Sequence, residues 1–307
     1  MTKPPLQGPL LHVPVLAAEV LSALHIFPDG VYFDGTIGVG GHAALILQQL
    51  SSQGRYIGID RDEEALSHCK QRFSASSVSV SLHHGSYHNI KSILGRYGVQ
   101  RVNGFILDLG LSSLQLDSDS RGFSFQTDSA LDMRFDKSQS ETAADILNTL
   151  PSPDLANIIY KYGQERRSRT IARNIEKCRP LISVTDLVEA VRRVTPPNHR
   201  NRTLARVFQA IRIKVNSELD HLNTFLNPSR ANILAIGLDF FATNASVACT
   251  KLSTPADIVG AFGHDSVNSG SRMAYFGRIA SPLIPILRFS ILSMNDALGV
   301  ISLPVPA

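Results

Sequence analysis

Strand-like and helix-length segments alternate between residues 31 and 109, and this alternation limits the folds open to the chain. Short runs rich in β-branched and aromatic residues predict strands over 31–35, 55–60, 78–84 and 102–109. Segments of helical length separate them, over 41–50, 62–73 and 87–98. Strands joined by helices form right-handed βαβ units. The pattern therefore predicts an α/β fold with a mainly parallel sheet.

After Leu109 the alternation ends, and helical patterns dominate up to about residue 226. Ser152 is expected to be the N-cap of a helix that stops near Gly163. The segment 201–226 has the pattern of a continuous helical stretch. These segments predict a helical insertion of about 100 residues within the α/β domain.

The stretch FDGTIGVGGH, residues 33–42, places Gly38, Gly40 and Gly41 between the first strand and the first helix. Glycines in such a turn let backbone amides approach a ligand closely, next to a helix N-terminus. Residues 38–43 also fit the dinucleotide pattern G-x-G-x-x-G/A literally, so an NAD-dependent oxidoreductase is one alternative. A tight turn that needs glycine only for packing is another.

Three acidic residues lie at the carboxyl ends of predicted strands: Asp34, Asp60 and Asp108. Because open α/β sheets bind ligands at the carboxyl ends of their strands, these carboxylates are expected near the glycine loop. Asp60 lies 20 residues after Gly40, the spacing of a carboxylate that accepts the hydroxyls of an adenosine ribose.

Positive charge is concentrated between residues 161 and 214, where 14 Lys and Arg residues stand against 4 acidic ones. Helical spacing predicts one face for Arg166, Arg169 and Arg173. An arginine-rich surface of this kind suits an RNA backbone, although a solvated helix face is the simpler alternative. The candidate RNA-binding residues are Arg166, Arg169, Arg173, Arg206 and Arg212.

Other features exclude several classes of protein. The three cysteines lie far apart, so neither a disulfide framework nor a zinc site is predicted, and no metal is expected. The first 20 residues lack the pattern of a secretory signal peptide, and no apolar run reaches 18 residues. We therefore expect a cytoplasmic protein without a membrane span.

Eight blocks in order give the chain a specific resemblance. They are HVPVLAAEVL, FDGTIGVGGH, YIGIDRDEEAL, ILDLGLSSLQLD, RGFSF, LDMRFD, YGQERRSRTIAR and FQAIRIKVNSEL. Over residues 11–226 the chain resembles the ribosomal RNA small-subunit methyltransferase H family, also called MraW. The resemblance implies a class I, Rossmann-like fold with a helical insert, and S-adenosylmethionine as methyl donor. It also implies a cytidine N4 in 16S rRNA of the 30S subunit as acceptor. It leaves the oligomeric state open, with a dimer as one option.

The resemblance also implies roles for individual residues. The cofactor would meet Gly40, Gly41 and His42 at its methionine end, Asp60 at the ribose, Tyr87 beside the adenine, and Asp108 and Gln115 near the methyl group. Tyr87 stands where the family usually has Phe. Asp108 is also the candidate catalytic residue, as an acceptor for the N4 protons.

The resemblance divides the chain into a first methyltransferase part (1–112), an inserted helical RNA-binding domain (113–214) and a return to the methyltransferase domain (215–307). From residue 227 the sequence departs from the family, lacks Glu and Gln, and misses the family's Ser/Thr-Phe-His-Ser-Leu-Glu-Asp-Arg block. A reading-frame change near codon 226 and divergence of the last third are the two interpretations. Either makes a catalytically impaired RNA-binding homologue the alternative function.

Overall fold

The structure is a computed structural model, and the residues it describes are 14, 16–116, 120–226, 273–280 and 286–293 of the 307-residue chain. The tail predicted to be atypical from residue 227 therefore lies outside the described residues, except for two strands. These strands, β5 (Met273–Ala280) and β6 (Ile286–Ser293), pair with each other in antiparallel register.

The predicted parallel sheet is confirmed. Its strands are β1 (Val31–Asp34), β2 (Arg55–Asp60), β3 (Ser79–His84) and β4 (Gly104–Ile106). They lie in the order β3-β2-β1-β4, and every neighbouring pair is parallel. From β1 the chain adds β2 and then β3 on one side of the sheet, and β4 then pairs with the other side of β1. This reversal leaves a crevice beyond the carboxyl ends of β1 and β4, where doubly wound sheets bind their ligands.

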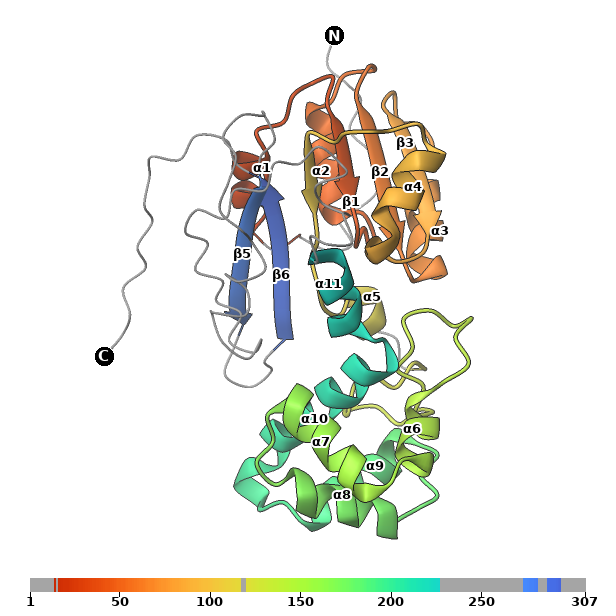
Figure 1. Cartoon of the computed structure of the whole chain (residues 1–307), viewed down its shortest axis with the longest axis vertical. Helices are drawn as coiled ribbons and strands as arrows, with labels where there is room; N and C mark the ends of the chain where they lie inside the picture. Colours follow the sequence, from red (N-terminus) through yellow and green to blue (C-terminus); the bar gives the residue numbers. More distant parts are fainter. Residues whose placement is uncertain (1–13, 15, 117–119, 227–272, 281–285, 294–307) are drawn as a thin grey trace, which may run out of the picture.

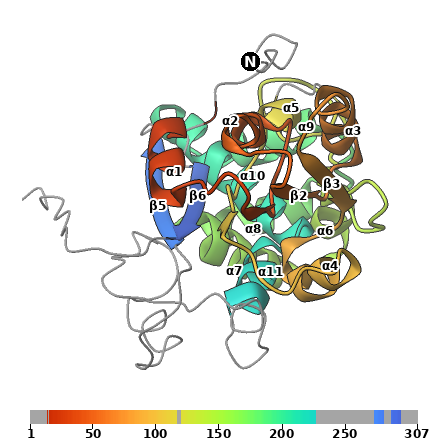
Figure 2. The same ribbon diagram turned by 90° about the horizontal axis from the view of Figure 1, so that it is seen from above.

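Helices cover both faces of this sheet (Figure 2). On one face, Tyr32 and Tyr56 pack with α1 (Ala17–Leu24), α2 (Gly41–Gln49) and α3 (Glu63–Arg72). On the other face, the next residues along the strands, Phe33 and Ile57, pack with α4 (Ile90–Arg96). This arrangement follows from the two-residue period of a strand and explains why β1, β2 and β4 have buried residues on both faces.

A helical unit lies beyond the carboxyl ends of the strands (Figure 1). Its helices are α5 (Ser113–Leu116), α6 (Ala143–Thr149), α7 (Ser152–Gly163), α8 (Ser168–Lys177), α9 (Val184–Arg193) and α10 (Arg200–Val215), followed by α11 (Glu218–Leu226). The unit has its own hydrophobic core, formed by residues between Leu111 and Val215. None of the helices in the described part of the chain combines the length and apolarity that crossing a bilayer requires.

Three local predictions were wrong. The fourth strand ends at Ile106 instead of 109, because the Asp108 N–H donates to Thr36 Oγ1 at 2.7 Å instead of joining the sheet. The helical stretch 201–226 is broken after Asn216, where Ser217 adopts a left-handed backbone with φ 48°. The N-cap of α7 is Pro151, and Ser152 is the first helical residue. The predicted domain boundaries stay predictions.

Candidate active site

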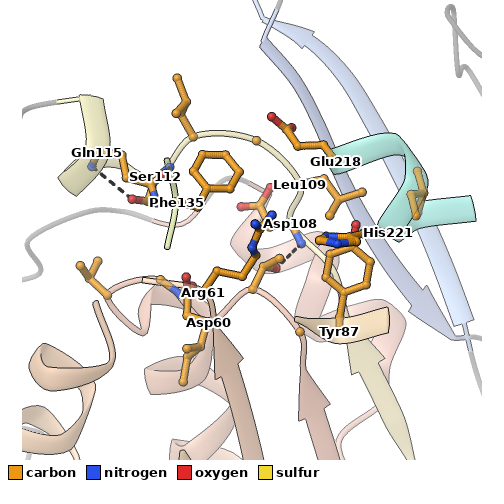
Figure 3. A pocket seen from close by; sticks show the side chains of 18 of the residues that line it. Asp60, Arg61, Tyr87, Asp108, Leu109, Ser112, Gln115, Phe135, Glu218 and His221 are labelled. Carbon is orange, nitrogen blue, oxygen red and sulfur yellow. Dashed lines mark hydrogen bonds between the residues drawn. The ribbon is translucent and has the colours of Figure 1, made fainter. Parts of the chain in front are cut away.

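One pocket lies in the crevice beyond the strand ends, against the helical unit (Figure 3). The sheet side contributes the loop after β1, the end of β2, Tyr87 and the segment after β4. The helical unit contributes Phe135 and residues of α10. Further lining residues come from α11, whose Phe225 packs into the core of the α/β unit. The site is therefore built from both units of the protein. Among its lining residues are Gly38, Gly41, His42, Asp60, Arg61, Tyr87, Asp108, Gln115, Phe135, Arg212, Glu218 and His221.

The glycine loop forms one wall of this pocket. Gly38 and Gly40 both adopt positive φ angles, 53° and 77°, which glycine tolerates without strain. Gly41 begins α2 and lines the pocket together with His42. Gly40 is not among the lining residues, and a Cβ on it would lie 2.7 Å from the Phe73 ring. At Gly40, close packing is thus a sufficient reason for glycine, whereas Gly41 and His42 face the pocket as expected.

Asp60 is the last residue of β2 and lines the pocket. Its Oδ2 accepts from the Gly38 N–H at 2.8 Å, and its Oδ1 accepts from the Asp62 N–H at 2.9 Å. These bonds fix the carboxylate and also tie the glycine loop to β2. Burial raises the pKa of Asp60 to about 6, and the two backbone hydrogen bonds oppose this effect. The position fits a hydrogen-bond acceptor held rigidly for ligand hydroxyls.

Asp34, the last residue of β1, is buried and is not among the pocket's lining residues. Its carboxylate accepts from the Tyr56 hydroxyl at 2.7 Å and from the Thr36 N–H at 3.0 Å. Burial raises its pKa to about 7. Of the three strand-end acids, two reach the pocket, while Asp34 instead orders the turn that leads to the glycine loop.

Asp108 and Gln115 follow β4 and line the opposite side of the pocket. The Thr36 hydroxyl holds the backbone of Asp108, as described above. Gln115 is buried, and its Nε2 donates to Asp62 Oδ2 at 3.2 Å. The same carboxylate is paired with Arg121, and both of those side chains are almost completely buried. Gln115 is thus fixed by the turn that follows Asp60.

Tyr87 begins the short 3-10 helix that follows β3, and its ring packs edge-on against Phe225 of α11 at 5.6 Å between centroids. Beside it, the imidazole of His221 stacks on His88 with the ring centroids 4.2 Å apart. Burial, together with the positive charge of Arg61 and the neighbouring His88, lowers the pKa of His221 to about 4. At neutral pH the pocket therefore has a neutral imidazole on its α11 side.

Sequence reasoning missed several residues of the pocket. Phe135, Glu218 and His221 line it, and so does Arg61, which directly follows Asp60. Arg61, Phe135 and Glu218 lie inside the blocks YIGIDRDEEAL, LDMRFD and FQAIRIKVNSEL, so these blocks were the available signal. Without the fold, no spacing rule relates them to the glycine loop.

The five candidate RNA-binding arginines do not share one surface. Arg169 and Arg173 are exposed on α8, and Arg166 is exposed in the turn just before this helix. Arg206 is half-buried and pairs with Glu165 at 3.5 Å. Arg212 is buried in the pocket wall, where it pairs with Glu218. The predicted surface is therefore corrected to exclude Arg212, and its exposed part is formed by Arg166, Arg169 and Arg173.

Comparison with known proteins identifies the chain. Residues 9–239 match the model of the MraW methylase family. The chain belongs to this family. The match extends past Leu226, the predicted end of the resemblance, into residues that the structure does not describe.

Three relatives carry the name ribosomal RNA small subunit methyltransferase H. The protein of Syntrophotalea carbinolica is 46% identical over 226 residues, covering 72% of each chain. That of Geobacter sp. (strain M21) is 45% identical, covering 69% of this chain and 70% of the relative. That of Thermosipho africanus is 42% identical, covering 74% and 78%. The fold is accordingly that of a class I, Rossmann-like methyltransferase, and the methyl donor of this family is S-adenosylmethionine.

The residues present fit this cofactor. Asp60 keeps lone pairs available after accepting two backbone N–H groups, because an ionised carboxylate has about four acceptor sites. No salt bridge within the described residues occupies it. Ribose hydroxyls can therefore donate to Asp60, while Tyr87 offers an aromatic wall and the start of α2 lines the same pocket.

Cofactor affinity should fall as the pH drops below about 6. With its pKa raised to about 6, the Asp60 carboxyl becomes protonated in this range and loses acceptor capacity. The affinity for S-adenosylhomocysteine should then decrease by up to about tenfold per pH unit. Calorimetry between pH 5 and 8 measures this dependence. An Asp60→Asn variant lacks the titrating group, and an unchanged pH profile in that variant would assign the effect to another residue.

Proposed function

We propose that the protein is an S-adenosylmethionine-dependent methyltransferase that modifies N4 of a cytidine in 16S rRNA of the small ribosomal subunit. The relatives named above support the rRNA substrate, and the resemblance of the eight sequence blocks supports the cytidine N4 target. The observation that carries the proposal is the pocket shared by the strand ends and the helical unit. It lets one site hold the cofactor on its sheet side and a nucleotide on its helical side.

The chemistry requires positioning more than activation. The cofactor supplies a methyl group that is already electrophilic, whereas the N4 lone pair of cytosine is delocalised into the ring. Asp108 accepts hydrogen bonds from the N4 amine and so helps to localise this lone pair on nitrogen. Holding both partners in line can lower such a barrier by roughly 7–11 kcal/mol.

The target base has to leave its stack to reach this site. Phe135 of the helical unit and Leu219 and Leu222 of α11 border the pocket and exclude water from an inserted base. The exposed arginines of α8 hold the RNA backbone through charge-assisted hydrogen bonds. In this proposal the helical unit binds the RNA, and the pocket beneath it selects the nucleotide.

Incubating the full chain with 30S subunits and labelled S-adenosylmethionine tests the function directly. Formation of N4-methylcytidine in 16S rRNA is the expected result, detected by nuclease digestion and mass spectrometry. Binding of both cofactor and 30S subunits without methyl transfer would contradict the proposal and favour the catalytically impaired RNA-binding homologue. Binding of NADH in preference to S-adenosylmethionine would favour the oxidoreductase.

The charge-reversed variant Arg166→Glu, Arg169→Glu, Arg173→Glu should bind 30S subunits more weakly and with a flatter salt dependence. Each lost phosphate contact reduces the slope of log K against log salt by about 0.7–0.9. Cofactor affinity should not change, because these residues are outside the pocket lining. Filter binding across a salt series measures the slope.

A matched control reverses three exposed basic residues of the α/β unit, Lys91, Arg96 and Arg101. It carries the same change in net charge at a different place. Equal slopes for the control and the α8 variant would show that only net charge matters, and a wild-type slope in the α8 variant would contradict the proposed surface.

A further inference from the structure

Arg61 lines the pocket directly after the Asp60 carboxylate. Its side chain extends from the end of β2 into the pocket, toward the side where Phe135 and Asp108 lie (Figure 3). The guanidinium thus reaches the part of the pocket assigned to the nucleotide, whereas Asp60 faces the cofactor.

The helical unit holds this guanidinium in place. Nη1 donates to the backbone carbonyl of Asn216 at 2.6 Å, and Nη2 donates to the side-chain oxygen of Gln139. The Cζ atom lies 5.7 Å from the centroid of the Phe135 ring. Asn216 is the C-cap of α10, so its carbonyl belongs to the negative end of the helix dipole, which favours a cation.

The two residues that bind the Arg61 guanidinium are themselves held by hydrogen bonds. The fully buried Asn216 accepts from the Phe135 N–H at 2.7 Å and donates to the Met133 carbonyl at 2.7 Å. The Gln139 amide donates to the Val215 carbonyl at 3.1 Å. Arg61 is therefore preorganised, with little rotamer freedom left to lose when a ligand binds.

Hydrogen-bonding capacity remains on this guanidinium. Arginine carries five N–H donors, and the two contacts above occupy two of them. Within the described residues, no carboxylate oxygen lies within 4.0 Å of an Arg61 guanidinium nitrogen, so Arg61 forms no salt bridge there. Burial lowers its pKa. A half-buried cation with unused donors favours a ligand that presents acceptors.

Cytosine presents the matching pattern. Its Watson–Crick edge has the N4 amine as donor, next to N3 and O2 as acceptors. Uracil has an acceptor at position 4 and a donor at N3. A pocket that presents both a carboxylate and a guanidinium can therefore distinguish the two bases, since RNA bases are read by hydrogen bonds to this edge.

We infer that Arg61 is a specificity-determining residue that donates hydrogen bonds to the N3 and O2 edge of the target cytosine, while N4 faces Asp108. Asn216 and Gln139 are the positioning residues that hold it there. The inference rests on the proposed methylation of cytidine N4, and it adds the group that separates cytidine from uridine.

The test uses the full chain saturated with S-adenosylhomocysteine and two labelled trinucleotides, ApCpA and ApUpA. Fluorescence anisotropy should show that the wild type binds ApCpA at least about tenfold more tightly, as one bidentate base contact provides. Arg61→Met should reduce this preference to twofold or less. Arg61→Lys, which keeps the charge and loses the planar fork, should fall between them.

Arg55→Met is the matched control, because Arg55 lies at the other end of β2 and donates to the Tyr97 carbonyl at 3.0 Å. It should keep the wild-type preference. Affinity for S-adenosylhomocysteine should stay within about threefold of wild type in all variants, which also verifies that they fold. A wild-type preference in Arg61→Met would overturn the inference, and so would an equal loss for both trinucleotides, which indicates a phosphate contact.

Failure of this inference and failure of the proposed function are distinguishable. If 30S subunits are methylated but base preference does not depend on Arg61, only the inference fails. If the preference depends on Arg61 but no methylation occurs, only the proposed catalysis fails.

Discussion

Replacing Asp60 by alanine is expected to weaken binding of S-adenosylmethionine by about 1.5–3 kcal/mol. The variant removes the acceptor for the ribose hydroxyls. It also leaves the Gly38 N–H without its acceptor at 2.8 Å, so the glycine loop loses one of its hydrogen bonds to β2. Isothermal titration calorimetry at pH 7.5 measures the change, and that pH lies above the raised pKa of about 6.

Asp29→Ala provides the control for this variant. Asp29 lies just before β1, at the amino ends of the strands and so away from the pocket. Its exposed carboxylate accepts a hydrogen bond from the Ser51 hydroxyl. Its removal should leave cofactor affinity unchanged. Thermal melting of both variants separates loss of affinity from loss of fold. An Asp60→Ala affinity within twofold of wild type would refute the ribose assignment.

The sheet and its ligand edge could be predicted because they depend on local patterns. Strand propensity, turn glycines and strand-end acids repeat along residues 31–109, and each is a property of a few consecutive residues. Parallel strands then bring their carboxyl ends to one edge, whatever the packing details. Asp60 and Asp108 follow from this geometry alone.

The wall from the helical unit could not be predicted in this way. Arg61 reaches Asn216 across 155 positions of sequence, and only the fold determines that contact. The break after Asn216 depends on one left-handed residue, Ser217. The count of charged residues also gave a wrong prediction for the RNA-binding surface, because it treats each arginine as exposed.

Arg212 is an example of this error, because the residues around it indicate a buried helix. The helix α10 is buried on several faces, with Leu204, Val207, Ala210 and Ile211 all inaccessible. A helix that is apolar around most of its circumference packs inside the protein. An arginine within such a helix is expected to be paired, since an unpaired buried charge is costly.

The partner of Arg212 is Glu218, across the break between α10 and α11. Arg212 Nε donates to Oε1 at 2.7 Å, and Nη2 donates to Oε2 at 3.1 Å. The side chains are 7% and 17% exposed, so solvent screens this pair little. The break at Ser217 turns the chain so that Glu218, the first residue of α11, meets the last turn of α10.

Glu218→Ala should therefore destabilise the protein by about 3–5 kcal/mol, since it leaves the buried Arg212 guanidinium without its carboxylate. The exposed pair Arg193–Glu189, at 3.3 Å with both side chains about 60% exposed, provides the control. Glu189→Ala should cost less than about 0.5 kcal/mol. Urea unfolding measures both. The double variant Arg212→Met, Glu218→Leu should recover part of the loss, because it removes the stranded charge as well. If Glu218→Ala stays within about 1 kcal/mol of wild type, solvent reaches Arg212 and the pair contributes no more than a surface one.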